Sequence, residues 1–182
     1  DNLGPVVAIA AGSSHNLALS FDGTVIGWGR NDSGETDIPD GLDSVVAIAA
    51  GNSRSLALLS DGTVAAWGNN NNGETDTDGI DNVVAIAAGS YHFLALSSDG
   101  SVTGWGANYS GQIDIPDGLD NVVAIAAGSQ FSLALSSDGR ITGWGYNSSG
   151  QTDMPEDLTA LVYCNDDGAM LDCAGVCGGS AI

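Results

Sequence analysis

The chain is built from one segment that is repeated four times. Each copy opens on Val-Val-Ala-Ile-Ala-Ala-Gly, and its tryptophan recurs at intervals of 39, 38 and 39 residues. A fixed period of this size indicates a repeat architecture, in which each copy is one supersecondary unit packed against its neighbours. Positions that stay constant between copies therefore belong to the scaffold, and specificity is expected at positions that differ. The predicted repeats are residues 6–44, 45–82, 83–121 and 122–160, which form a domain at 1–160 followed by a tail at 161–182.

Every copy reads as a set of short β-strands. An apolar run ends in glycine, Leu-Ala-Leu follows, and an Asp-Gly pair such as Asp22-Gly23 separates it from a Trp-Gly segment such as Trp28-Gly29. Asp-Gly between apolar runs predicts a hairpin with a type I′ turn, in which both central residues have positive φ. No stretch of helical length shows helical apolar spacing. The chain is predicted to be all-β, a β-propeller-type repeat array with four blades.

The repeat also resembles a known family. The pattern A-A-G-x-x-H-x-L-A-L-x-x-D-G-x-V-x-x-W-G-x-N-x-x-G-[EQ] is similar to the regulator of chromosome condensation repeat over residues 6–158, although Arg54 and Phe131 replace the histidine in copies two and four. The resemblance implies a propeller, which in this family usually has seven blades, and its members include nucleotide-exchange factors and a secreted bacterial inhibitor of β-lactamase. The Gly-Glu-Thr-Asp and Gly-Gln-Thr-Asp endings resemble those of secreted bacterial members. No partner-contact residue can be carried over from the repeat motif alone.

The charge of the chain excludes several classes of partner. Asp and Glu total 23, whereas Lys and Arg total 3, which gives a net charge of −20. Such a surface repels phosphates, so we expect neither nucleic acid nor anionic membranes as partners. No apolar run has the length needed to insert into a membrane. The chain begins at Asp1 and is interpreted as a mature product or a fragment, with an extracellular or cell-surface location expected.

The tail differs in composition from the repeats. It holds all three cysteines, Cys164, Cys173 and Cys177, and its segment DCAGVCGGSA resembles Asp- and Cys-rich repeats of secreted marine bacterial proteins. A structural zinc site needs four ligands, and no fourth ligand lies nearby. Cysteines in an acidic, extracellular chain favour disulfide pairing, which leaves the odd one to bond elsewhere.

Spaced carboxylates in the linkers raise the question of calcium. In copy two, Asp76, Asp78 and Asp81 follow a spacing that half matches an EF-hand loop, but Ala85 stands where the bidentate glutamate belongs. The pattern favours a solvated acidic surface. The alternative is a calcium site at these three residues or in the tail, which adds Asp166, Asp167 and Asp172. No other cofactor is expected.

The sequence predicts a binding protein rather than an enzyme. A phosphate-binding P-loop needs a lysine, and the chain has none. His15 and His92 share a repeat position that other residues also fill, so they read as packing residues rather than general bases. Binding to a protein, or to a second copy of the chain, is expected where loop residues vary. The predicted contact residues are His15, Arg54, Tyr91, His92, Phe93, Phe131 and Tyr146. Neutral drift at loop tips is the alternative interpretation.

The predicted function is that of a secreted or surface-displayed, non-catalytic propeller module serving as a structural or binding scaffold. One alternative is a self-assembling subunit of an extracellular fibre or surface layer, and a second is a calcium-dependent adhesin segment. Both end repeats carry the apolar pattern of the internal ones, with no polar cap. We therefore expect the array to close on itself, to continue into further blades, or to dock against another chain, rather than to exist as an open monomer.

Overall fold

A computed structural model describes residues 4–155 of the chain. Within this range the chain forms twelve strands and no helix, so the all-β prediction is confirmed. The strands are β1 (Val6–Ala11), β2 (His15–Ser20), β3 (Val25–Gly29), β4 (Val45–Ala50), β5 (Arg54–Leu59), β6 (Val64–Gly68), β7 (Val83–Ala88), β8 (His92–Ser97), β9 (Val102–Gly106), β10 (Val122–Ala127), β11 (Phe131–Ser136) and β12 (Ile141–Gly145). No helix long and apolar enough to cross a membrane occurs among the described residues.

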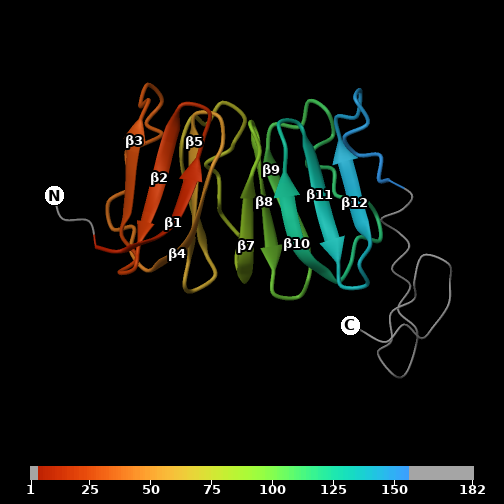
Figure 1. The fold of residues 1–182 in the computed structure, drawn as a ribbon, viewed down its shortest axis with the longest axis horizontal. Helices are drawn as coiled ribbons and strands as arrows, with labels where there is room; N and C mark the ends of the chain where they lie inside the picture. Colours follow the sequence, from red (N-terminus) through yellow and green to blue (C-terminus); the bar gives the residue numbers. More distant parts are fainter. Residues whose placement is uncertain (1–3, 156–182) are drawn as a thin grey trace, which may run out of the picture.

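The strands form four separate antiparallel sheets of three strands each, in the orders β1-β2-β3, β4-β5-β6, β7-β8-β9 and β10-β11-β12. Each sheet lies within one predicted repeat, and Figure 1 shows the sheets stacked side by side as the blades of a propeller. The pairing register is the same in each blade, including a shift near the start of the first strand, between Val6 and Ala8 in β1. The fourfold sequence repeat is therefore a fourfold structural repeat.

The Asp-Gly turn joins the second and third strands of each blade, as predicted, but its type differs. Gly23 has a φ of 86°, whereas Asp22 is outside the left-handed region, so the type I′ prediction is wrong. The amide of Gly23 donates to the carbonyl of Ser20 at 3.0 Å, which indicates a longer hairpin loop closed by a glycine bulge. The aspartate serves a different purpose: its Oδ1 accepts the backbone N–H of Thr24 at 3.0 Å. This bond holds the pKa of Asp22 below its usual value.

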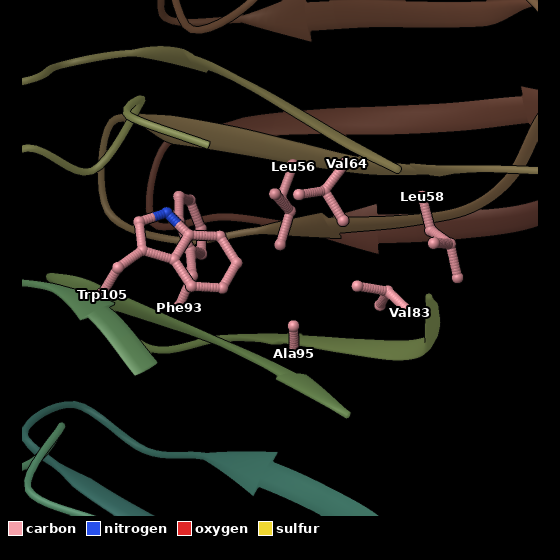
Figure 2. Packing of buried hydrophobic residues seen from close by; sticks show 7 residues of the cluster. All are labelled: Leu56, Leu58, Val64, Val83, Phe93, Ala95 and Trp105. Carbon is pink, nitrogen blue, oxygen red and sulfur yellow. The ribbon is translucent and has the colours of Figure 1, made fainter. Parts of the chain in front are cut away.

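The hydrophobic core is divided into clusters that lie between blades rather than within them. Figure 2 shows the cluster between the second and third blades, where Leu56, Leu58 and Val64 face Val83, Phe93, Ala95 and Trp105. The rings of Phe93 and Trp105 are tilted against each other, with centroids 5.5 Å apart. Equivalent clusters fill the other two junctions. A single sheet has no core of its own, so each blade depends on its neighbours for burial.

The four blades do not close into a ring within the described residues. Neighbouring sheets pack together, but the first and last sheets make no comparable contact and lie at opposite ends of the stack (Figure 1). The inner ends of all four blades line one pocket of about 270 Å³, which extends from Ala11–Ser13 of the first blade to Ala127–Gly128 of the fourth. The array is therefore curved but open within residues 4–155, so closure, the first of the three expected arrangements, is not seen among the described residues.

Candidate protein-binding site

The variable residues gather at one edge of the array, which we call the loop edge. It consists of the loops that join the first and second strands and of the Asn-x-x-Gly loops that begin the segment after each third strand. The two loops of a blade are tied together by a backbone bond, such as that from the amide of Arg30 to the carbonyl of Ser14 at 2.9 Å. The same bond occurs in the other three blades, where Asn69 donates to Ser53, Ala107 to Tyr91 and Tyr146 to Gln130. The scaffold thus holds the variable residues of each blade close together.

A buried ion pair supports the loop edge between the second and third blades. Nη2 of Arg54 lies 2.8 Å from Oε1 of Glu74, and both side chains are almost fully buried. The guanidinium also donates to the carbonyls of Asn52 and Ser90 at 3.0 and 2.8 Å, the second of which belongs to the next blade. Burial lowers the pKa of Arg54, and the carboxylate of Glu74 opposes that shift. Because each charge is matched, the pair rigidifies this junction without offering a free charge to a ligand.

Tyr91 lies over Arg54 of this ion pair, and Tyr91 and Tyr109 together line a groove beside it. The Tyr91 ring lies 5.5 Å from the guanidinium carbon of Arg54, and its hydroxyl accepts a hydrogen bond from Nδ2 of Asn52 at 3.1 Å. The Tyr109 hydroxyl donates to Oδ1 of Asn72 at 2.5 Å, although the residue is 76% exposed. The groove has a volume of about 270 Å³ and is lined by Asn52, Ser53, Arg54, Asn69, Asn71, Asn72, Tyr91 and Tyr109. We call it the tyrosine groove.

The two histidines lie inside the blade junctions. Nε2 of His15 is 3.0 Å from Oγ of Ser55, and Nε2 of His92 is 2.9 Å from Oγ of Ser132. Each hydroxyl donates its proton to a backbone carbonyl, for Ser132 that of Gln112 at 2.8 Å, so the histidine must be the donor through Nε2–H. Histidine and serine are both buried, so neither serine is open to a substrate. These pairs link blades, as the packing interpretation of the histidines predicted.

Burial divides the residues predicted to contact a partner. His15, Arg54, His92 and Phe93 are at most 3% exposed, because they lie on the central strand of their sheet and face a neighbouring blade, the preceding one for Phe93 and the next one for the other three. Their burial argues against direct contact with a partner. The side chains of Tyr91 and Phe131 are partly exposed, and that of Tyr146 is 44% exposed. Tyr109 was not among the predicted residues, although an aromatic residue inside the Asn-x-x-Gly loop of copy three alone was a signal for it.

The aspartates proposed as calcium ligands are not grouped with one another in the described part of the chain. Among residues 4–155, no three His, Cys, Asp or Glu side chains come together in a way that could hold an ion, so Asp76, Asp78 and Asp81 do not converge. Asp76 accepts a hydrogen bond from Nδ2 of Asn70 at 3.2 Å, and Asp81 accepts one from Nδ2 of Asn82 at 2.8 Å. The first of these bonds recurs in every blade and holds the loop shut. The predicted disulfide residues Cys164, Cys173 and Cys177 lie outside the described residues.

Exposed carboxylates line the edge opposite the loop edge, which we call the turn edge. There each hairpin turn meets the end of a linker, as where Gly23 lies against Ser44. The exposed acidic residues of these turns and linkers are Asp22, Asp40, Asp43, Asp61, Asp78, Asp81, Asp99, Asp117, Asp120 and Asp138. Exposed acidic residues therefore line the turn edge, while the loop edge carries the exposed aromatic residues Tyr109 and Tyr146 together with exposed carboxylates such as Asp32.

Separate three-stranded sheets, cores at their junctions and variable loops on one edge together define a β-propeller repeat protein. Comparison with known proteins identifies its family. Residues 6–35, 45–74, 83–112 and 122–151 match the regulator of chromosome condensation (RCC1) repeat. These matches cover more than half of the chain, so the chain belongs to the RCC1 repeat family. No curated protein matches the sequence.

Solved structures share this fold. Prp20p from Saccharomyces cerevisiae is 27% identical with a TM-score of 0.69, and the match covers 91% of this chain and 48% of that one. Human WBSCR16 is 22% identical with a TM-score of 0.66, over 78% of this chain and 47% of that one. The ectodomain of the Physcomitrella patens receptor kinase CR4 is 24% identical with a TM-score of 0.66, and the match covers 78% of this chain and 41% of that one. The chain thus spans less than half the length of each of these proteins.

Proposed function

We propose that this chain is a non-catalytic scaffold that binds a basic protein through the tyrosine groove. The observation that carries the proposal is the groove itself, in which hydrogen bonds hold Tyr91, over the neutralised Arg54–Glu74 pair, and the exposed ring of Tyr109. Tyrosines fixed in this way present contact area at little cost in side-chain entropy, and such residues are frequent hot spots of protein interfaces. The amide groups around them add donors and acceptors.

The charge of the chain supports a cationic partner. With 23 acidic and 3 basic residues, the whole molecule attracts a basic protein over a distance, and the electron-rich faces of the tyrosines accept cationic side chains at short range. Prp20p is described by its binding to Gsp1p and histones, and histones are basic proteins. This likeness supports a protein partner of that chemistry for the present chain.

Histones serve as the probe to test the proposal. We expect the chain to bind a purified core histone by isothermal titration calorimetry, and Tyr109→Ala to weaken binding about 30-fold, the loss typical of a tyrosine hot spot. Phe21→Ala is the matched control, since Phe21 is equally exposed, at 81%, but lies at the turn edge. This control variant is expected to bind like the unchanged chain.

Two outcomes would overturn the proposal. The first is that polylysine binds as tightly as the histone, because binding would then be a property of net charge alone. The second is that the Asp61→Asn, Asp99→Asn double variant weakens binding while Tyr109→Ala does not, which would assign the partner to the turn edge. Asparagine keeps the oxygen that accepts the turn amide, so this double variant changes the charge and preserves the turn.

We also propose that the protein works outside the cell or on its surface, as a variant of the secreted bacterial type. The support is its strongly acidic composition and the confinement of its cysteines to the tail. Labelling of intact and permeabilised cells with an antibody against the repeats tests this location, and signal that requires permeabilisation would contradict it.

A further inference from the structure

The three internal junctions between blades share one polar connection. The indole N–H of each later blade donates to a backbone carbonyl in the preceding blade, at the glutamate or glutamine that ends the Asn-x-x-Gly loop. The bonds run from Trp67 to Glu35, from Trp105 to Glu74 and from Trp144 to Gln112, each at 2.9 Å. A junction is therefore directional: one blade gives the tryptophan, and the blade before it gives the carbonyl.

The apolar part of each junction is directional as well. At the first junction, Leu17, Leu19 and Val25 of the first blade face Val45 and Trp67 of the second. The same residue types recur at the other two junctions. Each blade thus has a leading face, which carries its valine and tryptophan, and a trailing face, which carries its two leucines and its loop carbonyl.

The leading face of the first blade is uncovered. Trp28 is 50% exposed and Val6 is 46% exposed, whereas their equivalents Trp67 and Val45 are 6% and 5% exposed. Ile9, which also lies on this face, is 78% exposed. Within residues 4–155, no acceptor receives the indole N–H of Trp28. These three side chains form an apolar patch at a free end of the stack.

The trailing face of the fourth blade is incomplete in the matching way. Leu133 and Leu135 are only partly buried, although their equivalents Leu56 and Leu58 are 0% and 4% exposed. Gln151 is partly exposed, whereas Glu35, Glu74 and Gln112 are fully buried. The Gln151 side chain still shapes its loop by accepting the Ser149 amide at 2.8 Å, yet among the described residues no donor reaches its carbonyl.

We propose that a second copy of this chain docks head to tail, with the leading face of one copy on the trailing face of the other. Trp28 of one copy donates to the Gln151 carbonyl of the other, and Val6 and Ile9 pack on Leu133 and Leu135. The contact repeats an interface that the chain already forms three times. It uses other residues than the tyrosine groove, so it is independent of the proposed partner.

Each copy has one leading and one trailing face, so the contact is heterologous and joins unlike patches. The smallest assembly that leaves neither face exposed is a closed ring of two copies. The curvature that brings the inner ends of all four blades around one pocket favours such closure over a straight filament.

The junction between copies is expected to be weaker than the first and third junctions within the chain, because it lacks one hydrogen bond. At the first and third junctions a histidine bonds to a serine of the next blade, as His92 does to Ser132. The corresponding residues at the end faces are Phe131 and Asn16, which do not reproduce this bond. The junction between copies therefore keeps the tryptophan bond and the apolar cluster but lacks the histidine–serine bridge, which makes the contact reversible.

Sedimentation velocity of the full chain over a concentration series tests the proposal. We expect a concentration-dependent dimer or larger head-to-tail oligomer, and Trp28→Ser to raise its dissociation constant at least about 30-fold, as for a central tryptophan of an interface. Folding is expected to tolerate Trp28→Ser because the side chain is half exposed in the single chain, and circular dichroism checks this. Phe21→Ser is the matched control, since it removes an exposed aromatic residue outside both faces.

A variant that is expected to strengthen the association between copies provides a second test. The double variant Asn16→Ser, Phe131→His recreates the histidine–serine bridge between copies, and we expect it to tighten association about 3- to 10-fold, the worth of one hydrogen bond. A monomer at every concentration up to the solubility limit would overturn the proposal. So would an oligomer whose dissociation constant changes neither with Trp28→Ser nor with this double variant.

Discussion

His92 makes the stability of the array depend on pH, and the structure gives the size of the effect. The side chain is fully buried, its Nε2–H donates to Ser132, and its Nδ1 is buried without a partner among the described residues. Protonation would place a charge at Nδ1 in a site that has no acceptor for it. Burial accordingly lowers the pKa of His92 from 6.5 to about 4.

The sign of the pH dependence follows from which state binds the proton. Between pH 6.5 and pH 4 the unfolded chain is protonated at this histidine, while the folded chain is not. Acidification therefore favours unfolding, and the stability that this group contributes above pH 6.5 is lost progressively until about pH 4. At about 1.4 kcal/mol per pH unit, the full loss is on the order of 3 kcal/mol.

His92→Phe isolates this contribution. Phenylalanine fits the position because Phe131 occupies it in the fourth blade, with its ring against Gly128 as the ring of His92 lies against Gly89. At pH 7 the variant should be about 1 kcal/mol less stable, since the bond to Ser132 is lost. At pH 4.5 it should be more stable than the unchanged chain by about 1–2 kcal/mol.

Urea unfolding followed by tryptophan fluorescence at pH 7, 5.5 and 4.5 measures the difference. Groups that titrate equally in both proteins cancel, so only the difference between the two curves reports on His92. A difference that stays constant across this range would refute the reasoning, because it would mean that the folded chain accepts the proton without cost. His15→Phe offers an independent repeat at the first junction, where burial also lowers the histidine pKa.

Three further predictions concern the junctions. Trp67→Phe should lower the free energy of unfolding by about 1 kcal/mol through loss of the hydrogen bond to Glu35. Trp28→Phe should change the free energy of unfolding of the monomer little. If chemical denaturation shows the same loss of stability for both variants, the hydrogen bond of Trp67 does not contribute. Gly51→Ala should cost about 1–3 kcal/mol, because its Cβ would lie 2.5 Å from the Gly89 carbonyl oxygen; an unchanged melting temperature would argue against it. Arg54→Phe should cost about 3–5 kcal/mol by leaving Glu74 buried and unpaired. Adding Glu74→Gln, which copies the fourth blade, should recover part of this loss, and no recovery would mean that the charge is not the cause.

The sequence was informative wherever the structure depends on contacts within one repeat. The positions of the strands, the hairpin at Asp22-Gly23 and the assignment to an all-β repeat array all follow from residues close together in the chain. The turn type was missed because the aspartate is retained for its side-chain bond to Thr24 and not for a positive φ. The local sequence pattern therefore predicted that a hairpin turn lies at Asp22-Gly23 but did not predict its backbone conformation.

The candidate site was harder to predict because it is made between repeats. Arg54 was predicted to contact a binding partner, yet its ion-pair partner Glu74 lies in a later loop of the same blade and its other contacts include the third blade. The sequence does not show that position 54 begins the central strand of a sheet and faces the next blade. The tyrosine groove joins Asn72 of one repeat to Tyr109 of the next, a contact between residues 37 positions apart that no local pattern reveals.

Cores that lie between blades also affect how such a chain can change length. Removal of residues 45–82 would join the first blade directly to the third, where Trp105 would meet the Glu35 carbonyl in place of that of Glu74. The apolar cluster would be rebuilt from Leu17, Leu19 and Val83, residue types that already face each other elsewhere. Duplication of a repeat would add one junction of the same kind. Gain or loss of whole repeats thus preserves the tryptophan bond and the apolar cluster, although this deletion would set His15 against Phe93 in place of Ser55 and remove one histidine–serine bridge. A cut inside a repeat would leave half of a core uncovered, so this fold tolerates unequal recombination at the repeat period better.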